Sequence, residues 1–148
     1  MDPLSIVASS IAIVTICSQV TALISKLVSG QHTDQLLQAL YKEVGLFSTI
    51  LNSVAAITKR PGLECIAEND GGDLWNTVTR ILRSSKSTMR GLRKILRDVK
   101  EGIEAESLWR RSVAFLIFER KKNEIWDLLR EIQSSKATLQ IALQSVNL

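Results

Sequence analysis

Four long stretches of this 148-residue sequence repeat hydrophobic residues at helical spacing, and few residues interrupt them. Between residues 37 and 54 the hydrophobic side chains step alternately by three and four positions: Leu37, Leu40, Val44, Phe47, Leu51 and Val54. This spacing is typical of the seam of an antiparallel bundle or coiled coil. With only two prolines and seven glycines, the chain lacks the turn residues that an all-β fold needs. We therefore expect an all-α domain.

Helix-end signals divide the chain into four long helices and a short one. The first helix has Asp2 as its N-cap and Pro3 at its first position, and it ends near Val28, before Ser29 and Gly30. The other helices are expected at about residues 33–57, 73–103, 107–118 and 120–146, with a long loop at 58–72 and an acidic break at 101–106. Lys136 falls on the last seam and is expected to extend its amine outward. The prediction is one domain over residues 1–148, a largely antiparallel bundle of four long helices plus a short helix.

The chain has few residues for metal or nucleophile chemistry. Cys17, Cys65 and His32 are its only cysteines and histidine, too few for a four-ligand zinc site. Phosphate-loop, dinucleotide and nucleophile-elbow motifs are also missing from the sequence. Cys17 could pair with His32 as nucleophile and base, but its apolar surroundings favour a buried core residue. We expect a cytosolic domain with no catalytic residue, cofactor or metal.

The first helix carries no charge from Pro3 to Ser25, a length that could span a bilayer. Eight of these 23 residues are Ser, Thr or Gln, and no basic region precedes them, so neither a permanent anchor nor a secretory signal is predicted. Its first half points apolar residues nearly all round the axis: Leu4, Ile6, Val7, Ile11, Ile13 and Val14. A helix of this kind is either buried on every side or placed in lipid. We expect it to be the central buried helix at rest, and a second role in a bilayer stays open.

The third long helix carries a face of one charge sign. Residues 74–100 contain eight basic residues and one acid, Asp98, a net charge of +7 against +4 for the whole chain. At helical spacing the basic residues share the side opposite the seam: Arg80, Arg83, Lys86, Arg90, Arg93, Lys94, Arg97 and Lys100. Three interpretations remain: a solvated face, a nucleic-acid surface, or a surface for anionic lipid. Nucleic acid is disfavoured because no binding motif or stacking aromatic set accompanies the charge.

Both ends of the sequence resemble a known family. The opening MDPLSIVAS at residues 1–9, followed by Ile11 and Ala12, resembles the start of fungal HeLo-like domains, which precede the nucleotide-binding modules of fungal STAND (NLR-like) receptors. A looser pattern near the other end is similar too: Trp109, Lys122, Glu124, Ile125, Leu128, Leu129, Ser135, Lys136, Leu139, Ala142, Leu143 and Gln144. Together they cover almost the whole chain. The first helix departs from related openings in having no glycine and only the small pairs Ser5/Ser9 and Ala8/Ala12.

The resemblance implies a helical bundle related to the HeLo domains of fungal incompatibility proteins and to the bundle of the necroptosis pseudokinase. Such domains execute cell death: they oligomerise, move from the cytoplasm to the plasma membrane, and disrupt it with the N-terminal helix. By position, Leu4 to Leu23 is the membrane-active helix. The expected partners are further copies of this chain, anionic lipids and a downstream nucleotide-binding module in a longer receptor.

Two functions follow as expectations. The first is a cell-death effector domain that permeabilises membranes through its first helix, with the basic face on anionic lipid. The alternative is an interaction or adaptor domain without membrane activity. They differ in whether residues 4–14 must become exposed, because only membrane action requires it.

Overall fold

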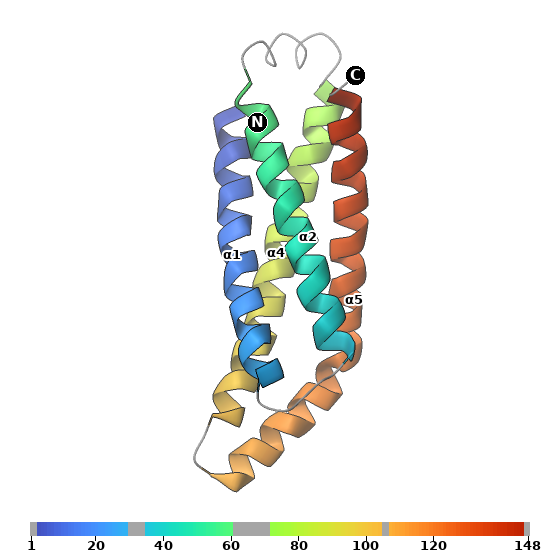
Figure 1. The fold of residues 1–148 in the computed structure, drawn as a ribbon. Coiled ribbons are helices and arrows are strands. Elements are labelled where there is room, and N and C mark those ends of the chain that lie inside the picture. The colour runs from blue at the N-terminus through green and yellow to red at the C-terminus, as the bar shows by residue number, and fades with distance from the viewer. Residues whose placement is uncertain (1–2, 30–34, 61–71, 105–106, 147–148) are drawn as a thin grey trace.

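The computed structural model describes residues 3–29, 35–60, 72–104 and 107–146. These residues form four helices: α1 (Pro3–Ser29), α2 (Gln35–Thr58), α4 (Gly72–Ile103) and α5 (Leu108–Val146). Figure 1 shows them side by side, each running opposite to the one before it. The prediction of an all-α, largely antiparallel bundle is confirmed.

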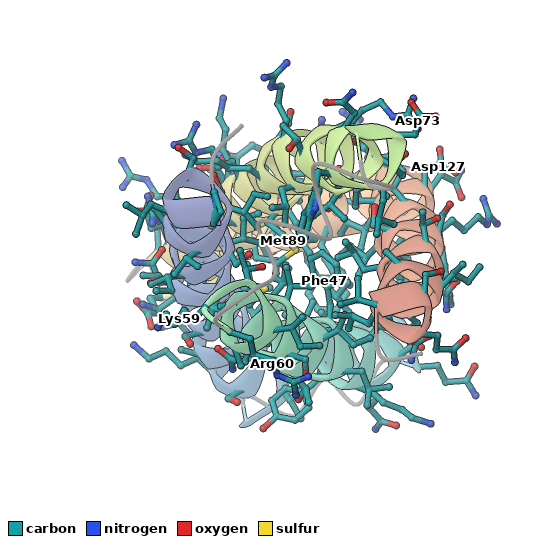
Figure 2. All side chains as sticks on the ribbon, turned by 90° about the horizontal axis from the view of Figure 1, so that it is seen from above. Phe47, Lys59, Arg60, Asp73, Met89 and Asp127 are labelled. Carbon is teal, nitrogen blue, oxygen red and sulfur yellow. The ribbon has the colours of Figure 1, made fainter. Side chains whose placement is uncertain are left out.

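The four helices stand at the corners of a square. Helix α1 packs on α2 and α4, and α5 packs on the same two helices from the other side. Viewed from above, α1 is therefore diagonal to α5, and α2 is diagonal to α4 (Figure 2). Phe47 of α2 and Met89 of α4 are fully buried at the centre, where all four helices meet.

The seams expected from the sequence form the core. All six residues of the seam at 37–54 are buried in α2. On α4 the seam positions Val78, Leu82 and Leu96 are buried, and Ser85 is buried among them. On α5 the buried seam includes Ile125, Ile132 and Leu139. Lys136 does not reach solvent freely, because its Nζ lies 2.7 Å from Glu43 Oε2 of α2 in a largely covered ion pair.

The expected short helix at 107–118 is not separate. Residues 108–146 form one continuous helix, α5, because no helix-breaking residue lies between Phe118 and Arg120. Ion pairs span this stretch: Lys122 meets Glu119 at 3.1 Å, and Lys121 meets Glu124 at 3.0 Å. At 1.5 Å per residue, α5 is about 58 Å long and α2 only about 36 Å, and the start of α5 projects beyond the start of α2 (Figure 1).

Helix α1 lies at a corner and is not the central helix that we expected. Its inner face is buried against α2 and α4, but a full side is exposed to solvent. Since the four helices pack around a shared core, none of them is enclosed by the other three. Polar residues make up much of the outer side of α1. A central position would have buried these polar residues in the core.

Candidate functional site

The six predicted membrane-inserting residues of α1 divide between core and surface. Ile6, Val7 and Ile13 are buried, and Val14 is half-buried against the core. Leu4 and Ile11 are 80% and 49% exposed. The first half of α1 therefore contributes to the bundle with one side and shows apolar side chains to solvent with the other.

The outer strip of α1 is uncharged along most of the helix. Its members share one side at helical spacing and are all exposed: Leu4, Ala8, Ile11, Thr15, Ser18 and Ala22. The Thr15 hydroxyl donates to the Ile11 carbonyl at 3.0 Å, and the Thr21 hydroxyl next to the strip donates to the Ser18 carbonyl at 2.9 Å. A hydroxyl that donates a hydrogen bond to its own helix keeps that bond when the helix enters the apolar interior of a bilayer.

Among the described residues, Pro3–Val28 is the one span long and apolar enough to cross a membrane, by length and composition alone. The buried core helix of a soluble protein meets the same criterion. Helix α1 also has the outer strip, which faces solvent with apolar and internally bonded side chains. This helix can therefore belong to a bundle and also suit a bilayer.

Two buried hydroxyls weaken the packing of α1 and α4. Ser10 on α1 and Ser85 on α4 are almost completely buried, and neither Oγ has a hydrogen-bond partner. An unpaired buried hydroxyl destabilises a fold by about 1–3 kcal/mol. Each of these two helices therefore packs into the core less stably than an apolar residue at that position would allow.

The basic face of α4, the eight basic residues named above, points away from the core. Five of them are exposed, and Lys86, Arg93 and Lys100 are half-buried. Arg93 donates to Gln19 Oε1 of α1 at 2.7 Å, and Lys100 lies 3.8 Å from Glu104. Within the part of the chain that the structure describes, six have no acidic partner: Arg80, Arg83, Lys86, Arg90, Lys94 and Arg97. Unpaired cations on one side create a positive potential that attracts anions.

A groove joins the basic face to α1. It is open, has a volume of about 240 Å³, and is lined by Gln19, Ala22, Leu23, Lys26 and Arg97. The bond from Arg93 to Gln19 ties the two helices at this level. The structure thus brings together the two features that the sequence analysis singled out separately. One surface that carries cations and the uncharged outer strip suits the headgroup region of an anionic bilayer.

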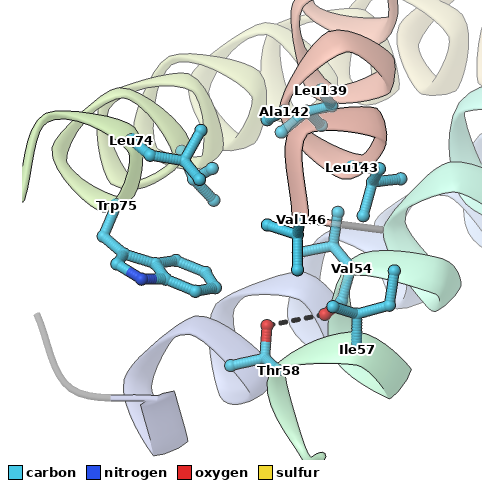
Figure 3. A pocket seen from close by; sticks show the side chains of 10 residues that line it. Val54, Ile57, Thr58, Leu74, Trp75, Leu139, Ala142, Leu143 and Val146 are labelled. Carbon is cyan, nitrogen blue, oxygen red and sulfur yellow. Dashed lines mark hydrogen bonds between the residues drawn. The ribbon is translucent and has the colours of Figure 1, made fainter. Parts of the chain in front are cut away.

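Among the described residues, the cavity at the other end of the core is too small for a small-molecule substrate. A cavity of about 20 Å³ lies between α2, α4 and α5, lined by apolar side chains around Trp75 (Figure 3). The Thr58 hydroxyl on its wall donates to the Val54 carbonyl at 2.6 Å, and Trp75 Nε1 is buried without a partner. This volume fits about one water molecule, far below the several hundred Å³ of a ligand pocket.

The residues considered for catalysis do not form a site in the described part of the chain. Cys17 is 1% exposed within the core, as expected for a small hydrophobe, whereas His32 and Cys65 lie outside the described residues. Among the residues that the structure describes, no three His, Cys, Asp or Glu side chains are grouped to hold a metal ion.

Sequence reasoning missed an exposed apolar segment at the start of α5, residues 108–117. Its large exposed side chains are Leu108, Trp109, Phe115, Leu116 and Ile117. The sequence analysis predicts a short helix of the bundle over this segment, without an exposed apolar side. The signal in the sequence was their distribution round the whole helix, together with the basic clusters at 110–111 and 120–122.

No family model, no curated protein and no solved structure matches this chain.

Proposed function

We propose that this chain is a cell-death effector domain that self-associates on activation, docks on anionic membrane lipids and permeabilises the membrane through α1. The observation that carries the proposal is the adjacency of the outer strip of α1 and the basic face of α4. The resemblance to HeLo-like domains supports the biological setting: a cytoplasmic resting state, action at the plasma membrane, and a nucleotide-binding module downstream in a longer receptor. The domain acts without catalysis, cofactor or metal.

The proposed mechanism has two steps. The basic face first draws the bundle to the membrane, at roughly 1 kcal/mol for each basic residue near anionic lipid. The first half of α1 then leaves the bundle, so that Ile6, Val7 and Ile13 exchange core contacts for lipid. The two unpaired hydroxyls lower the free energy needed for this departure, and the bonded threonines of α1 lower the free energy of insertion. Self-association gathers several α1 helices at one place in the bilayer.

Dye release from liposomes tests the proposal, with this domain held in oligomers by a fused oligomerisation tag. The informative variant is Ile11→Asp, because Ile11 is half exposed and a charge there leaves the resting core intact. A carboxylate at the centre of an inserting helix opposes transfer by about 2.5–3.5 kcal/mol. We expect release from anionic vesicles by the parent domain and a loss of at least tenfold in rate for Ile11→Asp.

The matched control is Ile141→Asp on α5, which makes the same change at a side chain 64% exposed. It should release dye like the parent domain. Charges at the buried Ile6 or Val7 should also abolish release, but their effect on folding must be measured separately. If folded, assembled protein releases no dye, or if Ile11→Asp and Ile141→Asp behave alike, the effector function is wrong and the adaptor alternative stands.

A further inference from the structure

Five of the eleven large hydrophobic residues that are exposed in the described part of the chain lie at the start of α5, within residues 108–117. Leu108, Trp109 and Leu116 are 77%, 76% and 59% exposed, and Phe115 and Ile117 are about two-fifths exposed. Single exposed hydrophobic residues are ordinary on protein surfaces. Five within ten residues, two of them aromatic, is a density that is typical of an interaction surface.

The geometry fixes which side of this segment faces outward. Ala114 and Phe118 are buried and hold the segment on the bundle. Trp109 and Leu116 are seven residues apart and stand on the same side, opposite these anchors. The contact between α4 and α5 is close here, because a Cβ added to Gly102 of α4 would lie only 2.4 Å from the Cβ of Ala114. The exposed apolar side chains are therefore presented outward by a firm contact.

The charges around the apolar side chains indicate what covers them. Residues 107–122 contain five basic residues and one acid, Glu119, a net charge of +4. Arg110 and Arg111 lie beside the exposed tryptophan, and Arg120 follows the last apolar residues, whereas Lys121 and Lys122 pair with Glu124 and Glu119. Trp and Phe side chains flanked by cations are typical of helices that lie in the headgroup layer of an anionic bilayer. A second copy of this positively charged segment would be repelled by the like charge.

We propose that residues 108–117 dock on the surface of an anionic bilayer, as a membrane contact separate from α1. The segment lies in the interface, with Leu108, Trp109 and Leu116 among the upper acyl chains and the arginines at the phosphates. The inference shares only the target, anionic lipid, with the proposed function. It concerns docking by the untagged, unassembled domain, whereas the proposed function concerns release after self-association.

Co-sedimentation of the untagged domain with vesicles tests this docking. The vesicles contain phosphatidylcholine with phosphatidylserine, or phosphatidylcholine alone. The variants are Trp109→Asp and Leu116→Asp, with Ile141→Asp on the same helix as the matched control. Each changed side chain is well exposed, so the folded bundle, checked by circular dichroism, should persist. We expect each segment variant to bind the anionic vesicles roughly tenfold more weakly, and Ile141→Asp to bind like the parent.

A second measurement reports the segment directly. In a Trp126→Phe protein, lipids brominated on the acyl chain should quench the exposed Trp109 and leave the half-buried Trp75 in the bundle unaffected. Equal binding by all variants, or no quenching, would overturn the proposal. So would segment variants that alter self-association in the absence of lipid, because that result identifies a second copy as the occupant.

The outcomes separate this inference from the proposed function. Weak binding by Trp109→Asp with no dye release by any assembled protein supports the docking segment and refutes the effector function. Unchanged vesicle binding by Trp109→Asp, together with dye release that is lost in Ile11→Asp, supports the effector function and refutes the docking segment.

Discussion

At the scale of single residues, small changes in the core decide how firmly α1 and α5 are held. Ser10 has an exposed fraction of 0% and an Oγ without a partner, so its hydroxyl is dehydrated and gains nothing in return. Gly102 has the opposite role, since it permits a close approach between α4 and α5 that any larger residue would prevent. Neither role can be read from the sequence, where one is a serine in an apolar run and the other a glycine near a helix end.

Replacing Ser10 by Ala should stabilise the bundle and slow membrane permeabilisation. The change removes the unpaired hydroxyl, so the free energy of unfolding should rise by about 1 kcal/mol or more. Denaturant unfolding measures this rise, and dye release should slow because α1 leaves less readily. Ser18→Ala at the exposed strip is the control for helix propensity alone, which favours Ala by about half a kcal/mol. A gain for Ser10→Ala no larger than that for Ser18→Ala would contradict the argument.

Replacing Gly102 by Ala should destabilise the junction of α4 and α5. The new methyl would lie 2.4 Å from the Cβ of Ala114, and overpacking of this kind destabilises by about 1–3 kcal/mol. Gly91→Ala, also within α4, meets nothing within 4 Å and should instead raise the free energy of unfolding by about 1 kcal/mol. Thermal unfolding checks the opposite signs. Ala114→Gly added to Gly102→Ala should recover part of the loss, and its failure to do so would place the strain elsewhere.

At the scale of helices, the sequence predicts those features that depend on residues close together in the chain, such as which face of a helix is buried. The predicted burial of Leu37, Phe47 and Val54 is confirmed. Helical spacing places these residues on one face of α2, and the bundle packs against that face. The apolar residues all round the helix at 108–117 were a signal for the exposure of Trp109 and Leu116, but the exposure itself depends on α5 being longer than the helices beside it, which no local pattern gives. The corner position of α1 was missed for a related reason: apolar composition is compatible with a central helix and with a corner helix that keeps one apolar side in solvent.

The ion pair between Lys136 and Glu43 joins two helices and should be worth more than a surface pair. Its two side chains are only 19% and 15% exposed, and their Nζ and Oε2 atoms are 2.7 Å apart. Lys136→Met leaves the carboxylate partly buried and unpaired, so the free energy of unfolding should fall by roughly 1–3 kcal/mol. Adding Glu43→Gln should restore part of it, which a double-mutant cycle in denaturant measures. Additive effects of the two substitutions would contradict a direct interaction.

At the scale of the whole molecule, charge is separated within a chain of modest net charge. Residues 74–100 carry +7 and the chain +4, so all other residues together carry −3. Because α2 is diagonal to α4 in the bundle, the cations of α4 lie on the side turned away from it. In the proposed mechanism, the cations of α4 turn this side of the molecule toward an anionic surface before contact, which brings the outer strip of α1 to the membrane.

If the placement of charge orients the molecule, two variants with the same net charge but changes on different sides should bind anionic vesicles differently. Arg90→Glu with Lys94→Glu, and Lys42→Glu with Lys59→Glu on the α2 side, each change two exposed cations to acids. Each pair therefore lowers the net charge of the chain from +4 to zero. The α4 pair should bind phosphatidylserine vesicles roughly 30-fold or more weakly, since two cations near lipid contribute about 2 kcal/mol. The α2 pair should retain most of the binding, and high salt should remove the difference by screening both surfaces. If both pairs lose binding equally, attraction depends on net charge alone and the basic face has no special part in docking.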